Sequence, residues 1–346
     1  MLGRSEVRAL GRYLHAGYAL RAAGEGRRPE QDPSALEADL TAARDALAEA
    51  LVAAGADPAR VADEANLLPV AHEAAQRGDR YAFVFAPDPS SFAVVRLRTR
   101  RRRERVFFGE AFDYTLLEYD EVLVEDYPAF LGGGGAPQPA SYSSAGQVRV
   151  DYAAIVEIGK RQFLPRAEEL VGAIHVPDEA FLERSGADAA LELLSLTKAV
   201  LRGRSVEPLW SRLQPRPADE RLQGFVQDYA AHAELRAAAE LFALQTDPGE
   251  APDPRSLAQR GALVAMLHDE PLGHLADLVG LAIVAVQTES ELPALLGARE
   301  LLVEFLAELR EGEGPAADAR ACARLARLSA KEIRDLAQAL WNKRAN

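Results

Sequence analysis

The sequence predicts a mainly helical α+β protein, in which N-terminal helices with a small antiparallel sheet precede an all-α C-terminal domain. Three observations support this fold class. Apolar residues recur at helical spacing over most of the chain, residues 80–126 are instead rich in aromatic and β-branched types, and a glycine- and proline-rich stretch follows them. A chain of 346 residues is long enough for about two domains. We therefore predict an α+β domain over 1–130, a linker or loop over 131–147 and a helical domain over 148–346.

The N-terminal helices are predicted from an apolar stripe and from helix start signals. The stripe consists of Val7, Leu10, Leu14 and Tyr18. Ser34, followed by Glu37, predicts a capping box at the start of a second helix. Asp57 and Pro58 predict the start of a third, which Pro69 is expected to kink or divide because proline lacks an N–H.

The sheet is predicted from four short segments of strand-forming composition. They are residues 81–85, 92–99, 106–108 and 114–124, with a turn-forming cluster of proline, aspartate and serine after the first. The connections are too short for the crossovers that parallel strands need. The sequence therefore predicts an antiparallel sheet of three or four strands at about 80–126.

The remainder of the chain is predicted to be helical, after a break. Four consecutive glycines at 132–135, followed by prolines and serines, disfavour regular structure, so this stretch is a flexible linker or a long loop. Residues 275–286 are apolar on nearly every side, which predicts the central buried helix of the C-terminal domain. Ser329 and Glu332 predict a further capping box.

Composition limits the class of protein. Acidic residues outnumber basic ones by 53 to 40, and the resulting net charge of −13 disfavours nucleic acid and anionic membrane as partners. The single cysteine, Cys322, excludes an intramolecular disulfide and suits a reducing compartment. The N-terminus does not resemble a signal peptide, and the longest apolar run is too short to span a bilayer. We expect an acidic, cytoplasmic protein, and its arginine and alanine usage suggests a GC-rich bacterial genome.

Seven arginines fall in or beside two of the predicted strands. They are Arg96, Arg98, Arg100, Arg101, Arg102, Arg103 and Arg105. Such a run can bind nucleic acid or an acidic partner. Alternatively, it pairs with acidic residues of a neighbouring strand and protects a sheet edge from aggregation, which is the interpretation we favour. In that case Phe107 and Phe108 face the core and do not stack on bases.

A second group of residues has the chemistry of a metal site. His268, Asp269, His274 and Asp277 surround a proline at which one helix is expected to end and another to begin. His274 and Asp277 are three residues apart, a spacing that puts two ligands on one helical face. His232 lies upstream in another helix. The alternative is that His268 and Asp269 only terminate a helix, by offsetting its dipole and capping the next one.

Two segments of this region resemble the HD superfamily of metal-dependent phosphohydrolases. They are YAAHAELRAAAELFAL, which contains His232, and ALVAMLHDEPLGH, which contains the pair His268-Asp269. The resemblance implies that these three residues bind a divalent metal together with a later aspartate. This chain departs from the family pattern after the pair, where Glu270 and Pro271 stand, and its fourth ligand is not evident.

Other catalytic signatures, including GxSxG, GxxxxGK[ST], GxGxxG and HExxH, are absent from the sequence. The leading hypothesis is therefore an interaction or regulatory protein that has a protein partner and needs no cofactor. The alternative is a hydrolase of HD type that uses a divalent metal, and a third hypothesis is nucleic-acid binding through the arginines. The sequence leaves open whether the protein is an enzyme.

Overall fold

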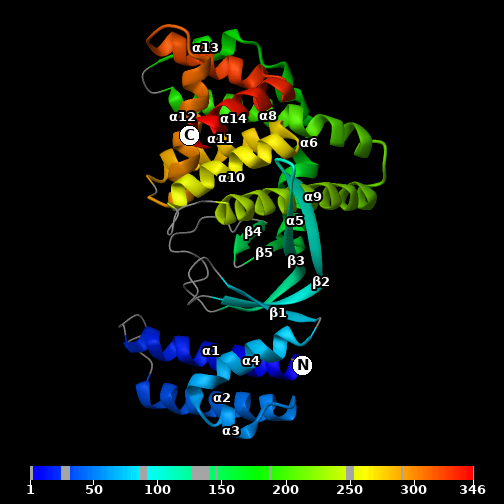
Figure 1. Cartoon of the computed structure of the whole chain (residues 1–346), viewed down its shortest axis with the longest axis vertical. Helices are drawn as coiled ribbons and strands as arrows, with labels where there is room; N and C mark the ends of the chain where they lie inside the picture. Colours follow the sequence, from blue (N-terminus) through cyan, green and yellow to red (C-terminus); the bar gives the residue numbers. More distant parts are fainter. Residues whose placement is uncertain are drawn as a thin grey trace. The chain divides into compact units, whose positions relative to one another are not determined.

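The computed structural model describes residues 3–24, 32–78, 80–85, 92–125, 141–144, 146–186, 189–246, 253–289 and 291–345. Within them the protein is mainly helical with one small sheet, which confirms the predicted fold class. The chain forms two compact units (Figure 1). The first comprises Met1–Arg102 and Thr115–Ala153, and the second comprises Arg103–Tyr114 and Ala154–Asn346.

The α-helices of the first unit are α1 (Arg4–Gly24), α2 (Pro33–Ala53), α3 (Pro58–Val61) and α4 (Leu67–Gln76). Two of them, α2 and α3, begin after an aspartate that caps them and precedes a proline. Asp57 caps α3 as predicted. The capping box predicted at Ser34 is wrong, because Asp32 is the cap and accepts a hydrogen bond from the Ser34 N–H. Pro69 lies in the first turn of α4, where a missing N–H costs little, so it does not divide a helix.

The described strands form one sheet in the order β1-β2-β3-β5-β4. They are β1 (Tyr81–Phe85), β2 (Phe92–Phe107), β3 (Glu110–Glu125), β4 (Ser141–Ser144) and β5 (Gln147–Asp151). The sheet is mixed, because β5 pairs with β3 in parallel. The connection from Glu125 to Gln147 exceeds the dozen or so residues that a parallel pairing requires. The antiparallel prediction overlooked this connection because no strand was expected beyond about residue 126.

Strands β2 and β3 form a long hairpin with a two-residue turn. Phe108 and Gly109 both have positive φ angles, of 51° and 83°, which is the backbone of a type I′ turn. The outer part of this hairpin, Arg103–Tyr114, belongs to the second unit. There Phe107 is buried against Phe242, in agreement with the predicted core position. Phe108 stacks on Trp341 with ring centroids 4.9 Å apart and remains partly exposed.

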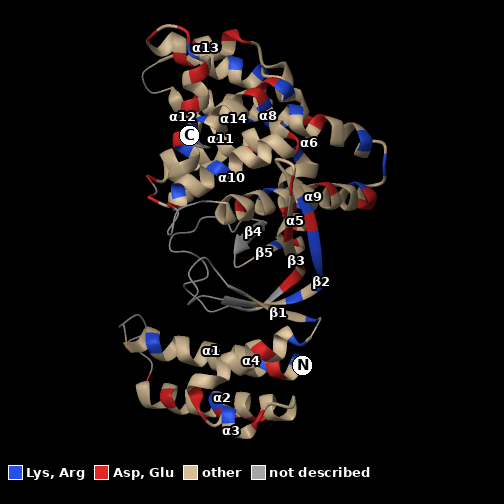
Figure 2. Ribbon diagram, viewed as in Figure 1, with Lys and Arg blue, Asp and Glu red and all other residues tan. Residues whose placement is uncertain are grey.

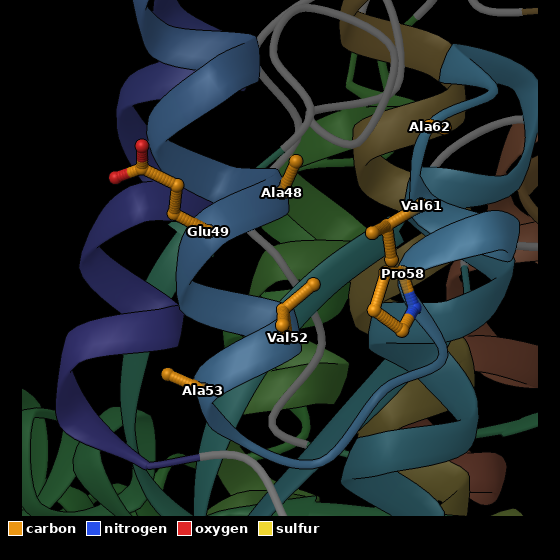
Figure 3. A pocket seen from close by; sticks show the side chains of 7 residues that line it. All are labelled: Ala48, Glu49, Val52, Ala53, Pro58, Val61 and Ala62. Carbon is orange, nitrogen blue, oxygen red and sulfur yellow. The ribbon is translucent and has the colours of Figure 1, made fainter.

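The hydrophobic core of the first unit lies between its helices and one face of the sheet. Side chains of α1, α2 and α4 cluster there with residues of β1 and β2, such as Phe83 and Val94. A shallow apolar hollow lies between α2 and α3, where Val52 points towards Pro58 and Val61 (Figure 3). The hollow is lined almost entirely by aliphatic side chains and holds no chemically reactive group apart from the Glu49 carboxylate.

The second unit is a helical bundle built around α11 (Pro271–Gln287). This helix packs against α8 (Ala190–Leu213), α10 (Pro254–His268) and α12 (Pro293–Leu309), as Figure 1 shows. Most of its side chains are buried, which confirms the predicted central helix. The other helices of more than one turn are α5 (Tyr152–Ile158), α6 (Ala167–Gly172), α7 (Glu179–Glu183), α9 (Ala218–Gln245), α13 (Pro315–Arg327) and α14 (Ala330–Ala345). The chain as a whole also contains short 3-10 and π turns, at Glu64–Asn66, Gly159–Phe163, Leu164–Arg166 and Ala173–His175.

The start of α14 is capped as the sequence predicts. The Glu332 N–H donates to Ser329 Oγ at 3.2 Å, while the Ser329 N–H donates to the Glu332 carboxylate at 2.7 Å. None of the described helices combines the length and the apolar character that a membrane span requires. Most of the predicted linker at 131–147 lies outside the described residues, so the linker stays a prediction.

Candidate functional site

Three helices of the second unit bring two histidines and an aspartate together. His232 lies in the middle of α9, Asp269 follows the last residue of α10, and His274 lies in the first turns of α11. One ligand atom from each of the three side chains lies within 4.8 Å of the other two. All three were metal-ligand candidates from the sequence.

The junction between α10 and α11 positions Asp269 and His274. Pro271 starts α11, and the Glu270 carboxylate caps it by accepting hydrogen bonds from the N–H groups of Leu272 and Gly273. Because Glu270 provides this cap, the Asp269 carboxylate is left to face the histidines. The Asp269 carbonyl oxygen accepts a hydrogen bond from Arg334 of α14 at 2.9 Å, which ties the junction to a further helix.

Both histidines direct a ring nitrogen at the same oxygen of Asp269. His232 Nδ1 is 3.2 Å from Asp269 Oδ2, and His274 Nε2 is 3.0 Å from it. The two imidazole rings are stacked, with centroids 3.9 Å apart and planes inclined by 19°. His274 is buried, whereas the side chains of His232 and Asp269 keep 19% and 29% of their surface exposed. Two of the three side chains therefore keep part of their surface exposed.

The carboxylate of Asp277, whose side chain is 16% exposed, lies next to His232. The Oδ2 atom of Asp277 is 3.5 Å from His232 Nε2, a nitrogen that is buried and has no hydrogen-bond partner among the described residues. The other oxygen of Asp277 accepts a hydrogen bond from Arg202 of α8 at 2.8 Å. Arg236 of α9 lies 4.0 Å from Asp277, so this aspartate faces a histidine and two guanidinium groups.

These neighbours separate the pKa values of the two histidines. Burial opposes protonation of His232, but the carboxylates of Asp269 and Asp277 outweigh it and raise its pKa to about 9. Burial, together with the nearby His232, lowers the pKa of His274 to about 4. Burial alone would raise the pKa of Asp269, yet its hydrogen bonds with the two histidines hold that pKa well below its usual range. In the metal-free chain one imidazolium and one neutral imidazole thus share an ionised carboxylate.

The cluster also carries the ligand types of a metal site. Zinc binds imidazole nitrogen and carboxylate oxygen at about 2.0–2.2 Å, so two ligand atoms of one ion lie about 3.0–3.5 Å apart. The separations of 3.2 and 3.0 Å from the two ring nitrogens to Asp269 Oδ2 fall in this range, which overlaps that of a hydrogen bond. Two imidazoles and one carboxylate suit zinc, iron or another divalent transition metal, and three protein ligands leave a position for water.

His268 faces another part of the unit. Its Nε2 atom accepts a hydrogen bond from the Phe108 N–H at 3.3 Å, and its ring meets Phe107 and Phe108 edge-on. The burial of this ring lowers its pKa, which suits a neutral acceptor. The structure therefore groups His232 with Asp269, His274 and Asp277, and it places His268 at the tip of the hairpin.

The arginines of β2 are engaged within the chain. Figure 2 shows the basic run along this strand. Arg96 pairs with Asp120 and Glu121, Arg101 with Glu118, and both Arg103 and Arg105 with Glu234. Arg98 lies over the Tyr152 ring, and Arg100 donates to the Gln76 carbonyl oxygen. Only Arg102 of the predicted seven has no contact of this kind among the described residues, and it is exposed.

The sequence analysis missed the other charged side chains of the site. They are Lys198 and Arg202 of α8, Arg236 and Glu240 of α9, and Arg334 of α14. A signal was present in α9, where His232, Arg236 and Glu240 recur every four residues in a helix that is otherwise rich in buried alanines. No protein-family model, curated protein or solved structure matches this chain. The case for a function therefore depends on the geometry of the site.

Proposed function

We propose that the second unit binds one divalent transition-metal ion through His232, Asp269 and His274 and uses it for hydrolysis. The observation that carries this proposal is the convergence of three ligand atoms from three helical segments on one partly exposed point. All three side chains are of types that bind divalent metals, and two of them keep part of their surface exposed.

The ligand set supports hydrolytic chemistry because it leaves part of the coordination sphere for water. A bound metal lowers the pKa of such a water and makes hydroxide available near neutral pH. In this chain Asp277 faces the outer nitrogen of His232 at 3.5 Å, the position that a carboxylate behind a ligating histidine commonly takes. Arg202 holds Asp277 in place from the opposite side.

The proposed ligand set differs from the one that the HD resemblance implies. His274 takes the place that His268 would have, because His268 is occupied with Phe108. The hypotheses of an interaction protein and of nucleic-acid binding have less support, since six of the seven arginines of β2 contact other residues of the chain. A protein partner and a cytoplasmic location stay predictions.

Two histidines of the same region provide a matched test. Three tag-free proteins are compared: the wild type, His274→Gln and His268→Gln. Each is loaded with zinc, dialysed to remove the excess and analysed for its metal content. We expect about one zinc per chain in the wild type and in His268→Gln, and a large loss of zinc in His274→Gln, because only His274 belongs to the ligand set. Hydrolysis of chromogenic ester substrates should follow the metal content.

Two outcomes would contradict the proposal. A wild-type protein that retains no zinc, iron or manganese after loading would show that the cluster is a hydrogen-bonded network only. Equal metal content in the two variants would show that the metal binds elsewhere. Circular dichroism of each variant, recorded in parallel, separates loss of a ligand from loss of the fold.

A further inference from the structure

One face of α11 carries a polar strip that continues from the histidine cluster. Gly273, Asp277 and Gly280 are spaced by four and three residues, so they lie on the same face of this helix. Seven residues of α-helix span about 10 Å. The helices α8 and α9 supply long polar side chains to this face, as the contacts of its two glycines show.

Glycine at two positions of α11 lets these side chains lie close to the helix backbone. A Cβ atom on Gly273 would come within 3.1 Å of His232 Cε1. A Cβ atom on Gly280 would come within 3.2 Å of Lys198 Cε and 3.3 Å of Lys198 Nζ. Between them Arg202 reaches Asp277. The strip therefore runs from the imidazole of His232, past the guanidinium of Arg202, to the ammonium of Lys198.

Three basic side chains, Lys198, Arg202 and Arg236, lie along this strip. Asp277 is the carboxylate nearest its middle, and it already has Arg202, Arg236 and His232 around it. Arg236 is also influenced by Glu240, the next acidic group on α9. Lys198, which is half-buried, forms no ion pair with a described residue. With a divalent metal bound, the charge of the metal, Lys198, Arg202 and Arg236 exceeds by one that of the carboxylates of Asp269, Asp277, Glu240 and Glu270, even if all four are ionised.

A half-buried ammonium without a carboxylate partner is costly unless an anion accompanies it. We infer that the strip of Lys198 and Arg202 binds an oxyanion group of the substrate beside the metal. This inference rests on the proposed metal site and names its substrate class, an anionic compound that carries a phosphate or carboxylate group. Guanidinium and ammonium groups both bind such oxygens through charge-assisted hydrogen bonds.

Lys198 is the residue to change, because Arg202 holds Asp277 and its loss would endanger the fold. The zinc-loaded and the metal-free wild type, Lys198→Gln and a control, Lys331→Gln, are titrated calorimetrically with inorganic phosphate and, separately, with acetate. Lys331 is an exposed lysine of α14, and its replacement by glutamine removes the same charge from the chain as Lys198→Gln does. Zinc content is measured on every sample.

We expect the zinc-loaded wild type and Lys331→Gln to bind one of the two anions with equal affinity. Lys198→Gln should bind it about tenfold more weakly or worse, as loss of one charge-assisted hydrogen bond predicts, with unchanged zinc content. Preference for phosphate or for acetate identifies the anionic group.

Equal affinity of Lys198→Gln and wild type, or no binding of either anion by a protein that holds its zinc, would overturn the inference. If zinc fails to bind, Lys198-dependent anion binding by the metal-free protein would uphold the anion site while the proposed function fails.

Discussion

Asp269 and His268 are adjacent in the sequence, yet they do different things in the structure. The Asp269 carboxylate faces two histidines, while the His268 ring accepts a hydrogen bond from a residue 160 positions earlier in the chain. Sequence reasoning identified both residues as candidates, together with His232, His274 and Asp277. It could not separate them, because the partner of His268 is at the tip of a hairpin and only tertiary structure brings it there.

The cap of α11 is a further case in which the sequence could not separate the roles of neighbouring residues. Asp269 lies two residues before Pro271 and is of a type that often caps helices, so its sequence context predicts a structural role. In the structure the longer side chain of Glu270 makes that cap. Lys198, Arg202 and Arg236 were not recognised as site residues, because a cation in an amphipathic helix normally belongs to the solvated face.

A pH-dependent prediction concerns Tyr114, which hydrogen-bonds Glu234 at 2.5 Å in the second unit. Burial, reinforced by that hydrogen bond, raises the pKa of Tyr114 to about 12 from a model-peptide value near 10. Because the folded-state pKa is the higher one, the stabilisation is complete below pH 10 and is lost as the pH rises from 10 to 12. Denaturant unfolding should show a steeper loss of stability over this range in the wild type than in Tyr114→Phe. Parallel curves for the two proteins would contradict the prediction.

At the scale of the elements, α11 carries both the core of the second unit and one side of the site. Its apolar residues are buried among α8, α10 and α12, which the apolar run around Asp277 made predictable. The polar strip was not predictable in the same way. Glycines at 273 and 280 are ordinary in an apolar helix, and their role depends on which side chains of α8 and α9 cross them.

Gly273→Ala tests whether this close approach matters for the metal. Alanine in place of glycine stabilises an isolated helix by up to about 1 kcal/mol. Here the new methyl group would press on His232 and on the Glu270 carboxylate, at 3.1 and 3.2 Å. Mutation of the groups that orient a metal ligand costs about 10–100-fold in affinity. Because the new methyl group displaces His232, we expect weaker zinc binding in Gly273→Ala, measured by competition with a chromophoric chelator.

Gly280→Ala is the matched control for this experiment. Its methyl group meets the flexible end of Lys198 and no part of the histidine cluster, so zinc affinity should equal that of the wild type. A parallel loss of zinc affinity in both variants would indicate a general effect on α11. Unchanged affinity in Gly273→Ala would show that His232 tolerates displacement.

At the scale of the whole molecule, the fold class followed from composition and periodicity because most helices carry an apolar stripe. The sheet was harder to predict. Its fifth strand follows a glycine- and proline-rich stretch, and the parallel pairing of β3 with β5 is a long-range contact. The hairpin tip, Arg103–Tyr114, belongs to the helical unit through Phe107 and Phe108, a division that no local pattern indicates.

The metal site is the central claim, and X-ray absorption at the zinc edge tests it most directly. Tag-free protein loaded with one equivalent of zinc should show a first shell of nitrogen and oxygen at about 2.0–2.1 Å. Multiple scattering from two imidazoles is expected, from His232 and His274, with no sulfur contribution because Cys322 is buried away from the cluster. A shell of oxygen alone, or the scattering of a single imidazole, would contradict the account.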